Sequence, residues 1–532
     1  MIVFTIAIIV SILNILHVII GFARETSESI YMGVGHYYLD YYQYLQPIAS
    51  GMRGKWTIEN YFTTDDPIKT IFGPWQYLLL GKVGALFHLS PVQTYWFFVF
   101  FFSLILAVLI FRFIQMLLSQ EPFYKQIAAF ILSLFAAPFF RISKVGEVFV
   151  TDIFGFWNDR SVLWKRFGGI PYHLSAQIIT IILLIITSDS LEKISKLSSA
   201  SILKRGLLCG ILIIVLFTFA PSYGILIVLS SMVTTSVLVW GSLGDRTTKK
   251  FSFILFHPII LLLVIPAGLF IKNYFSSEPY FLRISETEKA WQIHPSLKDV
   301  ILTTGPIVFF ALVGVPFFIK RLRVVRLLFL SFIAISYLFF FSDIPFRLGT
   351  TNMRFYSPLI YVFLGVLAVL IFKSKRTLLV ATLFLFLLFL PANIKAFIGQ
   401  LNDRNILLSP ITYLPAEAVA GFEFLGKYRQ EGNVLVSPRQ SLGMVMPTFM
   451  DRRMYIGRPA LTPSYVEKNL LSEGFFMGVM SNEEAEDFMR RNELTFVAVT
   501  SLEGYRNVPD YPFLRTIFKN NHVAILEVKR GQ

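Results

Sequence analysis

Residues 94–118 read TYWFFVFFFSLILAVLIFRFIQMLL, a run of apolar residues with Arg112 as its one charge. An α-helix rises about 1.5 Å per residue, so a run of this length can cross the roughly 30 Å hydrocarbon core of a bilayer. The stretch therefore predicts a membrane-spanning helix, and similar runs recur along the chain.

The composition of the whole chain also indicates a membrane protein. Of its 532 residues, 55% are hydrophobic and 15% are charged, against about 45–50% and about 25% in ordinary soluble domains. Phenylalanine occurs 55 times and aromatic residues make up 16% of the chain. That is more apolar surface than a water-facing protein of this length hides, and a bilayer removes the difficulty.

The charge and the cysteine content exclude several other classes of protein. The formal charge is +15 at pH 7, but Lys and Arg stand in short clusters between apolar runs and not on one face, so we expect no nucleic-acid partner. The single cysteine, Cys209, lies inside an apolar run. It provides neither a disulfide framework nor a cysteine-based metal site.

Eleven apolar stretches are predicted to span the membrane. The first is interpreted as a retained span and not a cleaved signal peptide, because it has no basic leader and no clear small-residue cleavage site. The stretches are 2–22, 94–118, 124–140, 171–188, 206–220, 223–241, 252–272, 300–319, 325–342, 354–372 and 377–396.

Basic residues between these stretches predict the orientation of the chain. Alternate short loops carry clusters of Lys and Arg, whereas the loops between them are nearly bare of charge. Because cytoplasmic loops are enriched in Lys and Arg, the N-terminus is predicted inside and the C-terminus outside, in what we expect to be a prokaryotic plasma (inner) membrane. The long segments on the outer side are then 23–93, 141–170 and 273–299.

The predicted fold is a polytopic α-helical membrane domain, residues 1–396, followed by a small α/β domain, residues 397–532. A helix is expected at 417–428, and a second one after Ser481, whose side chain can form a capping box with Glu484. Strand patterns are NVLVSP, FVAVT and HVAILEV, so we expect a mixed sheet covered by helices. The domain shows no phosphate loop, nucleophile elbow or metal-ligand spacing, and we expect it to handle substrate or to serve assembly.

The first outer segment contains GVGHYYLDYYQYLQPIASG, in which tyrosines surround Asp40. On a helix, Asp40 shares a face with Tyr44. A carboxylate among aromatic rings at a membrane surface suits a general base, because partial desolvation strengthens it as a proton acceptor and the rings can stack on a sugar. The alternative is a belt of interfacial tyrosines with a solvated aspartate.

Further acids lie in the outer segments. Asp65 and Asp66 precede a proline and are weak candidates for a divalent metal site, with a turn-opening Asp-Pro pair as the alternative. Asp152 and Asp159 of the second outer segment are candidates for a second catalytic acid. Both pairs also suit solvated loop positions.

Basic residues at the outer ends of spans are candidate phosphate ligands. Arg347 and Arg354 lie in DIPFRLGTTNMRFYSP, and the planar guanidinium fork suits a phosphate ester and its departure as a leaving group. Snorkelling to lipid headgroups is the alternative. His173 is a candidate supporting acid/base or phosphate donor, or a structural residue at a helix entrance. Arg160, Lys165 and Arg166 are candidate phosphate contacts in the second outer segment, or basic residues that a loop of this length tolerates freely.

This pattern resembles the type C glycosyltransferase superfamily (GT-C), in particular bacterial and archaeal relatives of protein mannosyltransferases. The resemblance covers roughly residues 1–396 and rests on LDYYQYLQPI, FGPWQYLLLGKVGALFHLSP and NMRFYSPLIYVFLGV. It implies an enzyme that takes a sugar from a polyprenyl-phosphate donor on the outer membrane face, with Asp40 as the catalytic acid and Arg354 as a donor-phosphate contact. Many relatives carry two acids in this loop, whereas Leu39 and Tyr41 flank Asp40, so a metal-binding pair does not carry over.

The implied reaction is inverting transfer to a glycan, lipid or protein acceptor. Asp40 accepts the proton of the acceptor hydroxyl, the hydroxyl attacks the anomeric carbon, and polyprenyl phosphate leaves against arginine or a divalent metal ion. The alternative is a multi-span transporter or flippase for a lipid or polysaccharide, which typically shows broken spans, ionisable residues in mid-membrane or an internal repeat. His17 and His257 are the main polar exceptions within the predicted spans.

Overall fold

The computed structural model describes residues 1–35, 38–66, 74–145, 148–156, 161–241, 247–402, 410–503 and 510–529. It divides into two compact units, each assembled from separate segments of the chain. The helical unit comprises Met1–Asn14, Val99–Glu278 and Ser285–Leu401, and the mixed unit comprises Ile15–Phe98, Pro279–Ile284 and Asn402–Gln532. The limits 1–396 and 397–532 expected for the membrane and outer domains stay a prediction, because packing alone does not mark a membrane boundary.

Within the described residues, seven helices are long and apolar enough to cross a membrane, and one bent pair makes an eighth candidate. The seven are α1 (Ile2–Ala23), α4 (Pro91–Leu117), α7 (Pro171–Lys193), α8 (Ser199–Phe217), α9 (Pro221–Gly241), α10 (Thr247–Ser277) and α17 (Lys375–Leu401). Three shorter apolar helices are α5 (Phe123–Phe135), α14 (Val324–Phe340) and α16 (Ile360–Leu370). These helices and the bent pair fall on the apolar stretches of the sequence, which confirms a polytopic α-helical membrane protein.

The span predicted at 300–319 is not one continuous helix. The stretch forms α12 (Leu297–Thr304) and α13 (Ile307–Lys320), bent by 99° at a short break. Gly305 lies in the break with φ +85°, and a Cβ there would stand 1.8 Å from the carbonyl oxygen of Ala137. Only glycine fits this bend, and the next residue, Pro306, cannot donate a helical hydrogen bond.

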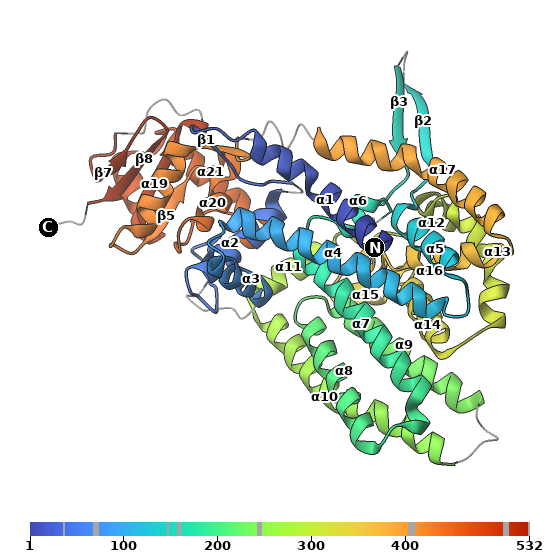
Figure 1. Ribbon diagram of the computed structural model, residues 1–532. Coiled ribbons are helices and arrows are strands. Elements are labelled where there is room, and N and C mark those ends of the chain that lie inside the picture. The colour runs from blue at the N-terminus through green and yellow to red at the C-terminus, as the bar shows by residue number, and fades with distance from the viewer. Residues whose placement is uncertain are drawn as a thin grey trace. The chain divides into compact units, whose positions relative to one another are not determined.

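Two other predicted spans have different limits in the structure. The span expected at 354–372 begins at Ile360, because a short 3-10 turn, η2 (Asn352–Phe355), and Pro358 precede it. The stretch expected at 124–140 is helical only to Phe135, and the chain then passes Pro138 into the hairpin of β2 (Phe140–Val145) and β3 (Val148–Ile153). Figure 1 shows this hairpin standing away from the helices of its own unit.

Helix α16 lies at the centre of the helical unit. All of its residues are buried, and it packs against α5 and α13. Glycines make these contacts possible, since a Cβ on Gly314 of α13 would lie 2.1 Å from the carbonyl oxygen of Leu367, and one on Gly365 would lie 2.7 Å from that of Ala129. Such close backbone approach is the usual device of helix association in a bilayer.

The mixed unit contains a four-stranded sheet in the order β5-β6-β8-β7, with β5 parallel to β6 and the other neighbours antiparallel. Its helices include α19 and α22, which confirm the helix expected at 417–428 and the Ser481–Glu484 capping box. The sequence did not predict β7 or α21. The elements are α19 (Ala416–Lys427), β5 (Asn433–Val436), α21 (Tyr465–Phe476), α22 (Asn482–Arg491), β6 (Leu494–Thr500), β7 (Leu514–Lys519) and β8 (Val523–Val528).

Residues 23–93, predicted to lie on the outer side and called the first outer segment below, belong to the same compact unit as this sheet. The segment contains α2 (Tyr38–Met52) and α3 (Trp75–Leu86). Its short strand β1 (Ser29–Tyr31) pairs with β4 (Tyr413–Pro415) of the C-terminal part, and Thr63 forms a bridge with Ile456. Residues separated by almost four hundred positions therefore fold together, as Figure 1 shows for β1 and the C-terminal helices beside it.

The glycine packing of α16 is testable with two matched alanine substitutions. Gly314→Ala places a methyl group against the backbone of α16, and overpacking of this kind costs roughly 1–3 kcal/mol. Gly399→Ala on α17 meets no atom within 4 Å and gains helix propensity. Thermal unfolding of the purified protein in detergent should show a lowered Tm for Gly314→Ala and an unchanged or raised Tm for Gly399→Ala. Equal behaviour of the two variants would contradict the packing.

Candidate active site

Asp40 lies in the first turn of α2, where the helix dipole favours a negative charge. The helix buries Tyr41, Tyr42, Leu45 and Ile48 on one side, and each is fully buried. Asp40 keeps 28% of its side chain exposed. Because the residues from Tyr41 to Ser50 are all buried except the half-buried Tyr44, Asp40 owes its partial exposure to its place at the start of the helix.

The tyrosines do not form the expected open stacking surface. Tyr44 stacks on Tyr77 of α3, with ring centroids 4.9 Å apart and planes inclined by 12°. One face of the Tyr44 ring is therefore occupied by protein. Tyr37, the other ring expected one turn from Asp40, lies outside the described residues.

A buried arginine of the C-terminal part holds Asp40. The Nη2 atom of Arg458 lies 2.5 Å from Oδ1 of Asp40, and its Nη1 donates to Oε1 of Gln43. The amide of Gln43 in turn donates to the hydroxyl of Tyr280 over 2.7 Å. Burial raises the pKa of Tyr280, although the Gln43 hydrogen bond and the nearby charges of Arg458 and Arg283 oppose that rise. Asp40 and Gln43 are one helical turn apart, so a single guanidinium clamps the start of α2.

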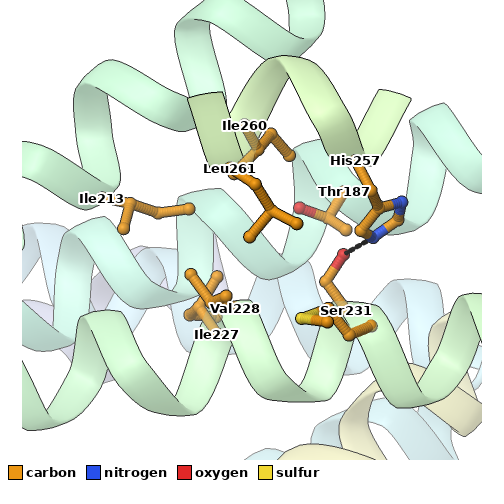
Figure 2. Close-up of a pocket in the computed structure, with 9 residues that line it drawn as sticks. Thr187, Ile213, Ile227, Val228, Ser231, His257, Ile260 and Leu261 are labelled. Atoms are coloured by element: carbon orange, nitrogen blue, oxygen red, sulfur yellow. Dashed lines mark hydrogen bonds between the residues drawn. The ribbon is translucent and has the colours of Figure 1, made fainter. Parts of the chain in front are cut away.

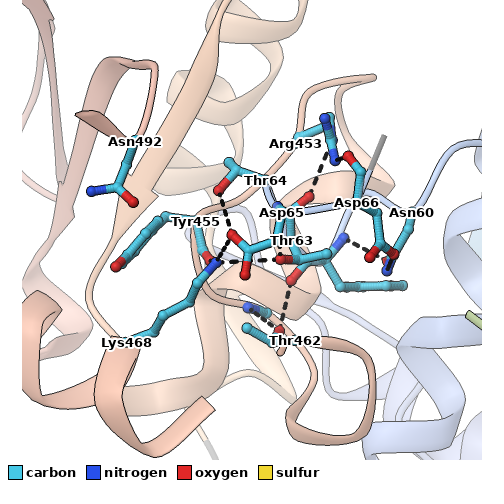
Figure 3. A network of polar contacts seen from close by, with 12 residues as sticks. Asn60, Thr63, Thr64, Asp65, Asp66, Arg453, Tyr455, Thr462, Lys468 and Asn492 are labelled. Carbon is cyan, nitrogen blue, oxygen red and sulfur yellow. Dashed lines mark hydrogen bonds and ion pairs between the residues drawn. The ribbon is translucent and has the colours of Figure 1, made fainter. Parts of the chain in front are cut away.

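Asp65 and Asp66, the weak metal candidates, are each engaged by a different cation. Figure 3 shows Asp65 beside Lys468 and Asp66 beside Asn60. Asp65 accepts from Nζ of Lys468 at 2.5 Å. Asp66 accepts from the guanidinium of Arg283 and, over 2.7 Å, from the amide of Asn60. The neighbouring Arg453 donates to the backbone carbonyls of Thr63 and Asp66.

These contacts join the first outer segment to the C-terminal part of the mixed unit. Burial lowers the pKa of Lys468, and the hydrogen bond and charge of Asp65 offset that only in part. In a second junction the first outer segment provides the cations, Arg53 and Lys55, and the C-terminal part provides the carboxylate, Asp451. Burial alone would raise the pKa of Asp451, but its bonds to Arg53 and the charges of Arg53 and Lys55 outweigh burial and lower it.

The carboxylates do not assemble a metal site. Among the residues that the structure describes, no group of three or more His, Cys, Asp or Glu side chains is close enough to hold an ion. The Asp65 and Asp66 carboxylates face a lysine and an arginine, which fits a divalent cation poorly. Their role as metal ligands stays a prediction.

Arg354 lies in the helical unit, in the turn η2, and it is also paired. Its guanidinium bonds to Glu288 of α11 (Pro279–Lys289), and its Nη1 donates to the hydroxyl of Tyr172 over 3.0 Å. The ring of His173 lies 4.0 Å from that of Tyr172, so the structure places His173 next to the Arg354 cluster. Arg354 is 23% exposed, which leaves it within reach of the surface.

The remaining candidates lie apart from these clusters. Arg347 ends the short helix α15 (Ile344–Arg347) and is exposed. Asp152 pairs with Arg141 across the β2–β3 hairpin at 2.9 Å, and both side chains are about half exposed, at 52% and 51%. Asp159 and Arg160 lie outside the described residues.

Arg166, a candidate phosphate contact, has a structural role. Its guanidinium is buried and donates to the carbonyls of Ser133, Leu134, Ala136 and Ser161. Ser133 and Leu134 belong to the last turn of α5 and Ala136 directly follows the helix, and the last carbonyls of a helix have no helical partner. Arg166 therefore caps the C-terminal end of α5. This role explains its presence in a predicted outer segment without a bound ligand.

The sequence did not single out Arg458, Lys468 or Glu288. Arg458 lies in MYIGRPALTPSY, where its neighbours Gly and Pro indicate a turn and nothing more. Each of these residues gains its partner from an element far away in the chain. Pairing of this kind has no signal in a single sequence.

A small cavity lies among α7, α8, α9 and α10, where His257 and Ser231 are 2.8 Å apart (Figure 2). Its volume of about 10 Å³ is far below the roughly 300–1,000 Å³ of pockets for drug-sized ligands. The Ser231 hydroxyl satisfies one ring nitrogen of His257, so this polar site in a span has a structural explanation. Its lining is Thr187, Ile213, Ile227, Val228, Ser231, Met232, His257, Ile260 and Leu261.

The junction between Asp65 and Lys468 should contribute to stability. The Lys468 side chain is only 6% exposed, so in Asp65→Asn a buried ammonium loses its counterion, at a cost of roughly 1–3 kcal/mol. Asp152→Asn, which removes an exposed pair, should change the Tm little. Thermal unfolding in detergent tests both variants, and an unchanged Tm for Asp65→Asn would show that the junction is not stabilising.

No family model and no curated protein sequence matches the chain. Among solved structures it is similar to the oligosaccharyltransferase of Archaeoglobus fulgidus in the apo form, with a TM-score of 0.51 and 12% identity over 94% of this chain and 69% of that one. The same enzyme with an inhibitory peptide and a dolichol-phosphate gives a TM-score of 0.49 and 13% identity, over 94% and 69%. A mycobacterial arabinofuranosyltransferase gives 0.47 and 11%, over 98% and 41%.

The similarity to the apo oligosaccharyltransferase extends over almost the whole chain, although the sequences have diverged widely. The chain has the fold of the GT-C membrane glycosyltransferases.

Proposed function

We propose that the protein transfers a sugar from a polyprenyl-phosphate-linked donor to an acceptor hydroxyl on the outer face of a prokaryotic plasma membrane. The observation that carries the proposal is Asp40, a partly exposed carboxylate at the start of a helix in the first outer segment of a GT-C fold. The fold is one of glycosyltransferases, and a partly exposed carboxylate can be reached by an acceptor hydroxyl whose proton it takes up. The A. fulgidus oligosaccharyltransferase has been captured with dolichol-phosphate, which supports a polyprenyl-linked donor here as an analogy.

In the proposed reaction Asp40 accepts the proton of the acceptor hydroxyl. The hydroxyl oxygen forms a bond to the anomeric carbon as the bond from that carbon to the phosphate oxygen breaks, with inversion. The electron pair leaves on polyprenyl phosphate, which carries its own negative charge and needs no further proton. The acceptor supplies the attacking oxygen, the donor supplies the sugar and the leaving group, and the carboxylate takes up the proton.

Arg354 is assigned to the donor phosphate. A guanidinium stabilises charge on phosphate oxygens, and its fork can engage two of them. In the structure this fork is engaged by Glu288 and Tyr172. We infer that a phosphate competes with the Glu288 carboxylate for Arg354, so that the arginine is held in place before the donor arrives. Arg347, seven residues earlier in the chain, is exposed. We assign its charge a weaker, long-range attraction for the donor phosphate.

The role of Asp40 is tested by Asp40→Asn in the full-length protein. Asparagine keeps an oxygen that accepts from Arg458 but cannot take up a proton at neutral pH, so we expect transfer to fall about 10²–10⁴-fold. The assay follows labelled sugar from polyprenyl-phosphate donors into a total membrane extract. Asp487→Asn, which alters a surface pair on α22, is the matched control and should retain full transfer. Undiminished transfer by Asp40→Asn would remove Asp40 from the mechanism.

A further inference from the structure

Arg458 is fixed by the backbone around it. The preceding Gly457 approaches Phe62 so closely that a Cβ would lie 2.8 Å from the Phe62 Cα atom. The turn η5 (Pro459–Leu461) follows, and Thr462 after it donates from its hydroxyl to the carbonyl of Phe62 over 2.7 Å. The turn that carries Arg458 is thus anchored to the first outer segment on both sides of the arginine.

The ion pair between Arg458 and Asp40 is asymmetric. The Arg458 side chain is 9% exposed and that of Asp40 is 28% exposed. The carboxylate therefore faces outward and the cation lies behind it. A buried cation that is not needed for packing is costly, because its desolvation is repaid only by well-placed partners.

Packing alone does not explain this arginine. Among the described residues, Nε of Arg458 has no hydrogen-bond partner although it is buried. By contrast, the adjacent structural arginines bond mainly to backbone carbonyls: Arg452 to those of Leu425, Tyr428 and Gln430, and Arg453 to those of Thr63 and Asp66. Arg458 instead directs its two terminal nitrogens at side chains of one helix face, those of Asp40 and Gln43.

We propose that Arg458 is a positioning residue for Asp40, and that the C-terminal part of the chain thereby completes the catalytic centre. Arg458 holds the carboxylate in one orientation and keeps a positive charge behind it, while Gln43 and Tyr280 hold the arginine. The inference rests on the proposed function, because it assigns Arg458 a part in proton transfer by Asp40. It gives the C-terminal domain a role in the reaction itself.

The test compares three variants of the full-length protein, Arg458→Gln, Arg458→Lys and the control Arg453→Gln. Displacing a reacting group by about 1 Å costs roughly 100-fold in rate. We expect Arg458→Gln to lower kcat by about that factor with the acceptor KM little changed, and Arg458→Lys to recover part of the loss because its ammonium can again pair with Asp40 and hold its orientation. Arg453→Gln should lower the Tm but leave kcat near that of the wild type.

Two results would overturn the inference. One is a wild-type kcat in Arg458→Gln. The other is a loss of kcat in Arg453→Gln as large as that in Arg458→Gln, accompanied by a similar loss of Tm. Both arginines would then act only through stability. If Arg458→Gln does not fold, Arg458→Lys decides: full stability with reduced kcat supports positioning, and an unchanged kcat contradicts it. Absence of transfer by the wild type would refute the proposed function, and full transfer by Asp40→Asn would remove Asp40 and Arg458 from the mechanism. Inactive Asp40→Asn with active Arg458→Gln would refute only the part of Arg458.

Discussion

Ion pairs join the first outer segment to the C-terminal part of the mixed unit, in addition to the pairing of β1 with β4. At Asp40 and Arg458, and again at Asp65 and Lys468, a carboxylate of the outer segment meets a buried cation of the C-terminal part. Each cation is far more buried than its carboxylate, so these charges are tolerable only as pairs. This constraint explains why the outer segment has one compact arrangement instead of being a loose loop between two spans.

The same pairs connect stability with chemistry. A carboxylate that forms an ion pair with a buried arginine is fixed in place, and a proton acceptor needs a fixed geometry. Asp40 meets both demands, since it pairs with Arg458 and remains partly open to solvent. Asp65 and Asp66 lie in the same segment and are bound by other cations, which fits structural roles better than metal binding.

Much of the architecture could be predicted from the sequence, because hydropathy and capping are local. The apolar runs predicted the spans, and Ser481 with Glu484 predicted the start of a helix that the structure confirms. The bend at Gly305 was missed because it depends on the close approach of Ala137, a tertiary contact. Arg458 and Glu288 were missed for the same reason, and Arg166 was misread because its carbonyl partners on α5 precede it by thirty or more residues.

Donor binding is the most direct test of the proposed transferase. Native mass spectrometry of the full-length protein, released from mild detergent with added polyprenyl-phosphate sugars, measures which lipid remains bound. We expect selective retention by the wild type, weaker retention by Arg354→Ala, and wild-type retention by Arg323→Ala, in which the altered arginine pairs with Glu192 elsewhere in the helical unit. Retention of no polyprenyl-phosphate sugar above other lipids, or equal retention by Arg354→Ala, would contradict the donor site.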